Sequence, residues 1–385
     1  MTTSKVFFQV TLLVGLGISV VEAEPPVNAE GTGLGIIPAQ FRRTVLEDPD
    51  TLNKALQSLI AADNPLRKFV DAANIKFKAF DSDKTGTDKS LGVSYDFSKD
   101  FSRYFVSDET ARSDGLTFNI SAKGNVAFDK AANPRDFLDS KLAFLGFASR
   151  GGAIATDDQT RAKLNDLEDA AAESQTREEF LRNPATVEAA RIIRAHMTTQ
   201  YYGELGVNGG IESDQSFSQK QYTYGGHLAL DIKGWNPDSP WARFNFFDYP
   251  FAATRLLLQN DTSWSPRGSA LPSVIAGIDQ VMPTGDDPRA KVGDKSDFPR
   301  LKFETGYRTL VGYIGGESAF FEANFRYYQE LGASAAVKAA SLDHATVFTA
   351  VLLLPRNTYV SYSVGRLPFD VKDSQVYELG FQYKF

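Results

Sequence analysis

Apolar and polar residues alternate along most of this chain. Leu116, Phe118 and Ile120 are separated by Thr117 and Asn119, and similar runs recur up to the last residue. A period of two is typical of β-strands whose two faces meet different surroundings. The pattern predicts an all-β chain of about twelve antiparallel strands, within a range of about ten to fourteen. The expected strands lie near residues 72-80, 89-97, 113-129, 199-211, 218-233, 241-258, 270-283, 300-314, 318-332, 344-354, 358-365 and 375-385.

The length of these runs bears on the kind of β protein. In a soluble sandwich the apolar face of each strand would form the core, and alternation alone fits that arrangement too. Many runs, however, reach the roughly nine to eleven residues that a membrane-spanning strand needs, whereas soluble strands usually have about five or six. Lipid offers no hydrogen bonds to the backbone, so such strands must join into a ring. We therefore expect a closed antiparallel transmembrane β-barrel over residues 72-385.

The N-terminal segment has the features of an export signal. Lys5 precedes the apolar run 6-21, and small residues end it at Ala23. This order predicts a signal peptide at 1-23 that is cleaved after Ala23, rather than a retained anchor. Residues 24-71 are expected to form an extended arm and a short helix after Asp50, placed either in the periplasm or as a plug inside the barrel.

The C-terminal strand carries the most specific motif. Its last nine residues, 377-385, place aromatic and aliphatic side chains at every second position. Glu378, Gly380, Tyr383 and Phe385 resemble the β-signal of Gram-negative outer-membrane barrels. The resemblance implies export to the bacterial outer membrane, recognition by the barrel-assembly machinery, and contact with outer-membrane lipid and lipopolysaccharide.

A helical insert interrupts the strand pattern at about 130-198. Leu164, Leu167 and Ala171 recur at helical spacing, and a second helical run follows Pro184. If the N-terminus is periplasmic, counting the expected strands places this insert and the polar stretch 284-299 on the external side. There the insert could cap the mouth, constrict the lumen or bind a partner.

Composition narrows the chemistry. The chain has 41 basic and 48 acidic residues without a long basic block, which disfavours nucleic acid as a partner. It has 0 cysteines, which removes disulfides and thiolate sites. Its 3 histidines are far apart in the sequence, and no metal or cofactor site is expected. Outer-membrane phospholipases use a neighbouring His and Ser, but Ala229 occupies the position two residues after His227, so we expect no enzyme activity.

Charged residues on the polar face of the strands are the candidate site. Inside a barrel that face would line the lumen, either as a path for a polar solute or as ion pairs that fill a closed interior. We predict a porin-like transport channel for a small polar solute. The alternatives are a plugged structural or adhesive barrel that binds a partner through the helical insert, and an outer-membrane hydrolase. The lumen candidates are His227, Asp231, Lys302, Glu304, Arg308, Glu322, Arg326 and Glu378.

Overall fold

The computed structural model describes residues 73-384 except 83-89, 108-110, 128-137, 153-156, 172-182, 215-218, 262, 285-287, 315-316, 357 and 369-372. The predicted signal peptide at 1-23, the arm and short helix at 24-71, and Phe385 of the predicted assembly signal lie outside the described residues. In the described part of the chain, no helix is both long and apolar enough to span a membrane.

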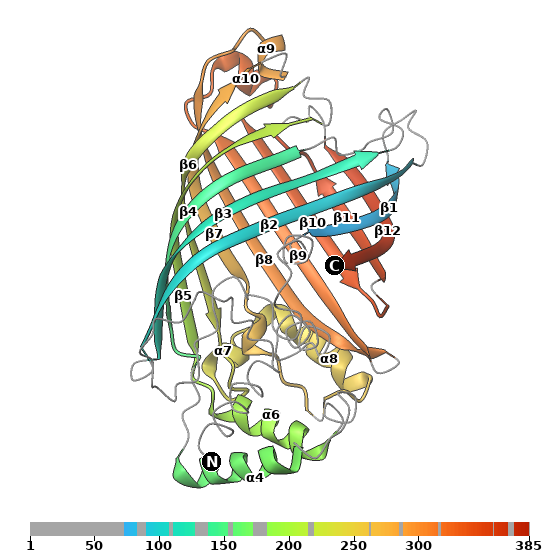
Figure 1. The fold of residues 1–385 in the computed structure, drawn as a ribbon. Coiled ribbons are helices and arrows are strands. Elements are labelled where there is room, and N and C mark those ends of the chain that lie inside the picture. The colour runs from blue at the N-terminus through green and yellow to red at the C-terminus, as the bar shows by residue number, and fades with distance from the viewer. Residues whose placement is uncertain are drawn as a thin grey trace.

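The strands form one antiparallel sheet, which confirms the all-β antiparallel part of the predicted fold class (Figure 1). The hydrogen-bonded order is β1-β12-β11-β10-β9-β8-β7-β6-β5-β4-β3-β2, and β1 pairs with β2 on one side and with β12 on the other. Each strand therefore has a partner on both sides. The strands are β1 (Ala73–Ser82), β2 (Ser90–Ser107), β3 (Arg112–Ala127), β4 (Leu138–Arg150), β5 (Gln200–Ser213), β6 (Lys220–Lys233), β7 (Ser273–Pro283), β8 (Phe298–Ile314), β9 (Glu317–Glu330), β10 (His344–Leu353), β11 (Thr358–Gly365) and β12 (Ser374–Lys384).

Two of the predicted segments are wrong. The range 138-150, assigned to the helical insert, is strand β4, whose apolar residues occur on both faces and hide the alternation. The range 241-258, assigned to a strand, contains the helices α7 (Pro240–Arg243) and α8 (Tyr249–Leu257). Pro250 lies in the first turn of α8, where a missing N–H costs no hydrogen bond. One missed strand and one false strand offset each other in the count.

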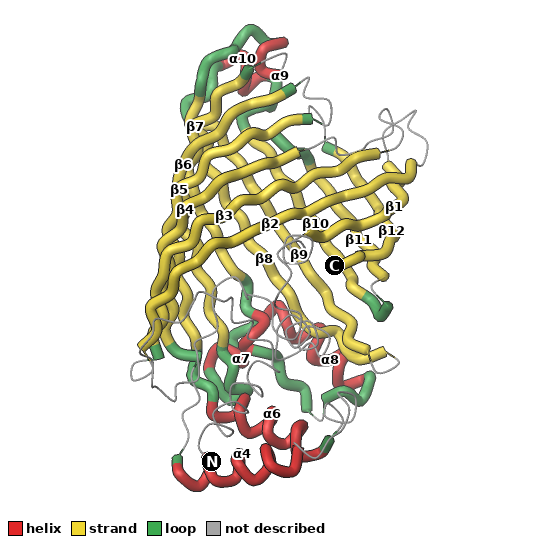
Figure 2. The backbone as a smooth tube through the Cα atoms, in the orientation of Figure 1, coloured by secondary structure: helices red, strands yellow, loops and turns green. Residues whose placement is uncertain are grey.

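These errors change the predicted position of the insert. Because β4 adds a crossing, the connection from β4 to β5 lies at the same end as the start of β1 and the end of β12, which we call the terminal end. This connection contains α4 (Asp158–Ala171) and α6 (Pro184–His196). The expectation that 130-198 lies opposite the N-terminal strand's start is therefore wrong. Figure 2 shows α4, α6, α7 and α8 together at that end.

We call the opposite end the distal end. Two of the connections at this end contain short helices. The β7–β8 connection contains α9 (Pro288–Lys291), and the β9–β10 connection contains α10 (Ala335–Ala339). Figure 1 shows both helices beyond the strands at this end. The polar stretch 284-299 thus lies opposite the terminal end, on the side where the sequence places it.

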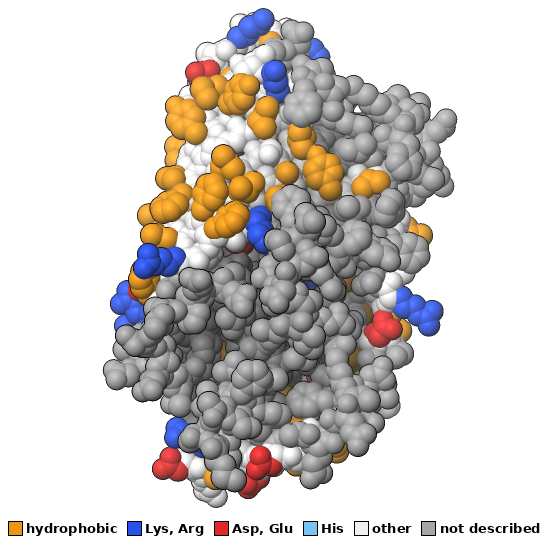
Figure 3. Space-filling view, viewed as in Figure 1, with side chains coloured by type: hydrophobic (Ala, Val, Ile, Leu, Met, Phe, Trp, Pro, Cys, Tyr) orange, Lys and Arg blue, Asp and Glu red, His pale blue; other side chains and the backbone are white. Residues whose placement is uncertain are grey.

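The two faces of the sheet have opposite chemistry. Large apolar side chains such as Leu205, Leu228 and Phe303 are exposed on the outward face, and orange side chains gather on the visible wall in Figure 3. The positions between them are buried and polar, as in Asp231 and Asp279. A water-soluble barrel would have the reverse distribution, because apolar area is stabilised by removal from water. The outward face is therefore suited to hydrocarbon.

Residues 240-261 and 263-264 cover part of that outward face at the terminal end, and we call them the α7–α8 segment. The ring of Phe251 lies 4.9 Å from that of Phe321 on β9 and 6.2 Å from that of Tyr307 on β8. Both of these strand residues share the parity of the exposed Phe303, which identifies the covered face as the outer one. The pairing of β7 with β8 begins at Ser273, which lies opposite Gly306. The part of β8 after Gly306 therefore has no partner from β7, and the segment lies beside this part.

Candidate functional site

A buried cluster of charges crosses the interior near the distal end. Arg300 of β8 donates from Nη2 to Glu212 Oε1 at 2.8 Å and from Nη1 to Glu212 Oε2 at 2.9 Å. Its Nη2 also lies 3.4 Å from Asp279 Oδ2 on β7, and Lys302 Nζ donates to Asp279 Oδ1 at 2.9 Å. Lys141 Nζ of β4 lies 3.9 Å from Glu212 Oε1. We call these five residues the lumen cluster.

The lumen cluster joins strands that are distant along the chain. Glu212 is on β5 and Arg300 on β8, so their contact crosses the interior rather than following a hydrogen-bonded strand pair. Glu212, Asp279 and Arg300 are each more than nine-tenths buried. Burial of a charge is costly unless it is paired, and here opposite charges supply the compensation. The cluster therefore places side chains of both signs across the interior.

A second set of charges lies on β8 and β9. Arg308 Nε is 3.2 Å from Glu322 Oε1, and Arg326 Nε is 3.5 Å from Glu304 Oε2. Asn324 donates to Glu304 at 2.8 Å. These are cross-strand pairs in the register of β8 with β9, and they continue the charged inner wall towards the terminal end.

The structure places all the predicted lumen residues on the polar, inward side but does not bring them into one site. His227 Nε2 contacts Glu204 Oε1 at 3.1 Å, and Asp231 Oδ1 lies 3.5 Å from Lys233 Nζ. Glu378 of β12 accepts a hydrogen bond from Ser361 of β11 at 3.0 Å, on strands that are not adjacent to those of the lumen cluster. Lys302 belongs to the lumen cluster, while Glu304, Arg308, Glu322 and Arg326 form the second set.

Sequence reasoning missed most of the lumen cluster. Arg300 and Asp279 have the parity of the predicted residues and could have been found by extending the alternation to the strand ends. Glu212 lies one residue beyond the predicted strand 199-211. Lys141 was hidden because its strand was assigned to the helical insert. No local signal indicates that Glu212 and Arg300 meet, since the closure of the ring determines that contact.

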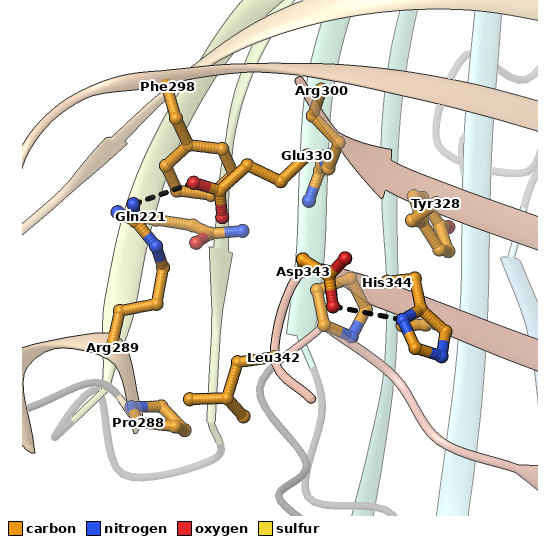
Figure 4. Close-up of a pocket in the computed structure, with 12 residues that line it drawn as sticks. Gln221, Pro288, Arg289, Phe298, Arg300, Tyr328, Glu330, Leu342, Asp343 and His344 are labelled. Atoms are coloured by element: carbon orange, nitrogen blue, oxygen red, sulfur yellow. Dashed lines mark hydrogen bonds and ion pairs between the residues drawn. The ribbon is translucent and has the colours of Figure 1, made fainter. Parts of the chain in front are cut away.

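A small open pocket lies at the distal end, next to Arg300 of the lumen cluster (Figure 4). Arg289 of α9 forms one side and donates to Glu330 Oε1 at 2.8 Å, while its guanidinium carbon lies 4.1 Å from the centre of the Phe298 ring. Asp343 and His344 form the other side and contact each other at 3.1 Å. Arg300 also lines the pocket, so the pocket and the lumen cluster share this side chain.

The distal connections are tied to each other around this pocket. Leu331 N donates to Pro299 O at 2.8 Å and joins the end of β9 to the start of β8, while Arg289 Nη1 donates to Ser296 O at 2.8 Å within the β7–β8 connection. Hydrogen bonds from Ser296 and Ser334 lower the pKa of Asp294 to about 2, so this carboxylate remains ionised between the two connections. Hydrogen bonds therefore hold the residues around the pocket mouth in defined positions.

At the terminal end, α4 and α6 pack on each other. Glu188 of α6 contacts Lys163 of α4 at 3.1 Å and Arg191 at 2.7 Å. Hydrogen bonds from Arg191 and Lys163 lower the pKa of Glu188 to about 2. The pair is joined to the barrel through Asn236, which donates to Ala195 O at 2.7 Å. The helices therefore hold a defined position beneath the strands.

The described residues contain no group of three or more His, Asp or Glu side chains placed to hold a metal ion. His227 and His344 each contact a carboxylate at 3.1 Å, but in this part of the chain neither ring is hydrogen-bonded to a serine hydroxyl. The candidate site is therefore the charged interior together with the distal pocket.

No family model and no curated protein matches the chain. Among solved structures, the chain is similar to the KdgM porin, with 9% identity and a TM-score of 0.24 over 81% of this chain and 99% of that one. It is also similar to the translocator domain of the autotransporter NalP from Neisseria meningitidis, with 8% identity and a TM-score of 0.23 over 86% and 98% of the two chains. The β domain of the Bordetella autotransporter BrkA gives 10% identity and a TM-score of 0.25 over 81% and 98%. At these values the functional assignment depends on the geometry of this chain itself.

Proposed function

We propose that this chain is a closed β-barrel of the bacterial outer membrane that gives a small polar solute a narrow, charge-lined passage. The observation that carries the proposal is the inverted distribution of side chains, apolar outside and charged inside. The solute enters at the distal pocket, where Arg289, Glu330 and His344 offer groups of both signs. It then meets the lumen cluster, which acts as the constriction.

The orientation follows from export. With the terminal end in the periplasm, the pocket opens to the exterior, and α4 and α6 lie on the periplasmic side. Glu378, Gly380, Tyr383 and Phe385 then form the signal that the assembly machinery reads, and the outward face contacts outer-membrane lipid and lipopolysaccharide. Glu378 and Gly380 lie on β12, the last strand, which pairs with the first strand β1.

A second function is favoured by one observation: the charges of the lumen cluster are paired and buried. Buried charges that form ion pairs also suit a permanently filled interior. In that case the barrel is a scaffold, and the α4–α6 pair is the surface that binds a partner. Hydrolysis is the third proposal, and its candidate is His344 with Asp343 at the distal pocket, because His227 and Glu204 face the interior.

Single-channel recording separates the first two functions. In planar bilayers at neutral pH, the purified full chain is expected to give discrete openings of small conductance, because the lumen cluster narrows the path. The folded state of the same sample is checked by circular dichroism. Complete absence of openings from a folded barrel, together with no uptake of small sugars or amino acids by proteoliposomes, would overturn the channel and favour the scaffold.

A further inference from the structure

The α7–α8 segment exposes an unusual concentration of large apolar side chains. Leu257 is 83% and Phe246 72% exposed, although both belong to a segment whose other side is buried. The remaining large apolar residues exposed on this segment are Phe244, Phe247, Leu256, Leu258 and Trp264. Contiguous exposed apolar side chains of this kind mark an interaction surface.

Two charged residues of the segment, Asp248 and Arg255, are turned towards the barrel. Arg255 and Asp248 are fully buried and form an ion pair at 2.7 Å. Arg255 also donates to Leu310 O of β8 at 2.6 Å, and Asp248 accepts hydrogen bonds from Thr309 and Tyr307 of the same strand. The arrangement is that of an interfacial helix, with its apolar side facing away from the protein.

The position of the segment indicates what covers it. On β8 the outward residues Leu301 and Phe303 are exposed, while Tyr307 and Thr309 lie under the segment. The exposed apolar surface of the wall and the exposed apolar side of the segment are therefore adjacent at the terminal end. Two of the 3 tryptophans of the chain, Trp241 and Trp264, lie in it. Tryptophan is enriched where a membrane meets water.

We propose that the α7–α8 segment is a membrane-interface anchor that inserts its apolar side into the phospholipid leaflet at the terminal end of the barrel. The proposal rests on the proposed membrane position of the barrel and adds a second, helical contact with lipid. Phospholipid fits better than a protein partner because the surface is adjacent to the lipid-facing wall. The exposed Arg243 at the end of α7 supplies a cation for lipid phosphate.

Fluorescent labelling tests this inference in the full chain, which has 0 native cysteines. A single cysteine at Leu257→Cys carries an environment-sensitive dye, and the protein is reconstituted into vesicles of phosphatidylethanolamine and phosphatidylglycerol. Leu205→Cys on the outward face of β5 is the reference for lipid, and Ala162→Cys on α4 is the reference for water. Lipids with a nitroxide on the acyl chain quench dyes in the bilayer, and iodide quenches dyes in water.

The expected result is strong quenching by the nitroxide lipids and weak quenching by iodide at position 257, as at position 205. Iodide quenching at 257 equal to that at 162, with position 205 still quenched by lipid, would overturn the anchor and leave the barrel in the membrane. Shielding of 257 from both quenchers would show that protein covers the segment and would also overturn the proposal. Iodide quenching at 205 as well would contradict the membrane barrel itself.

Discussion

Asp248→Ala is expected to lower the free energy of unfolding by about 3 to 5 kcal/mol, because it leaves the guanidinium of Arg255 buried without its main counter-ion. Of the two carboxylates that pair with Arg255 in the described part of the chain, the variant retains Asp261, at 2.8 Å from its Nε. Asp248 also accepts a hydrogen bond from Arg267 N at 2.7 Å, so the substitution removes a contact between the segment and the chain that leads to β7 as well. Urea unfolding of the protein in detergent micelles, followed by tryptophan fluorescence, measures the change.

Asp238→Ala is the matched control for this prediction. Asp238 is an exposed aspartate in the same connection, and its removal changes the net charge equally without emptying a buried site. Its unfolding curve should coincide with that of the unchanged protein. Equal stability of the Asp248→Ala and Asp238→Ala variants would show that the ion pair does not hold the segment on β8.

Arg300→Ala is the second prediction with a large effect. Arg300 provides two hydrogen bonds to Glu212 and a further contact to Asp279, so its removal leaves both carboxylates with less positive charge around them. The variant also loses the side chain that reaches across the interior. We therefore expect a higher single-channel conductance, a reversal potential shifted towards cation preference, and a loss of stability of about 3 kcal/mol or more.

The control for Arg300→Ala is Arg112→Ala on β3. Arg112 forms an exposed ion pair with Asp114 at 2.6 Å, on the outward parity of its strand. Its substitution removes the same charge from the chain without changing the interior, so conductance and ion preference should stay as in the unchanged protein. The same conductance in Arg300→Ala as in Arg112→Ala would remove the lumen cluster from the permeation path.

The fold class and the inner face could be predicted from the sequence because every second residue of a strand lies on the same face. The alternation of apolar and polar residues therefore shows which residues face the interior. Leu228 and Asp231 lie on opposite sides of β6, as their spacing requires. Alternation failed at β4, where Leu145 and Phe147 place apolar residues on the inner parity as well. It also failed at α8, where a dense apolar run fits strand and helix equally well.

The candidate site was predicted only in part for a different reason. Strand parity places Lys302 and Glu304 on the inner wall, but parity is a local property. The meeting of Glu212 with Arg300 depends on which strands face each other across the interior, and this follows from the whole ring. The predicted side of the helical insert was wrong because the missed strand β4 shifted every later connection to the opposite end of the barrel. The false strand at 241-258 then restored the correct ends for the connections that follow it.

The central claim is that the apolar side of these strands meets lipid. A scan of single spin-labelled cysteines along β6, from Gln221 to Asp231, in reconstituted vesicles tests it most directly. We predict that the labels at Tyr222, Tyr224, Leu228 and Leu230 are accessible to oxygen and shielded from a water-soluble nickel complex, with the reverse or no access at the positions between them. Shielding of those four positions from both reagents, as in a core packed between two sheets, would contradict the account.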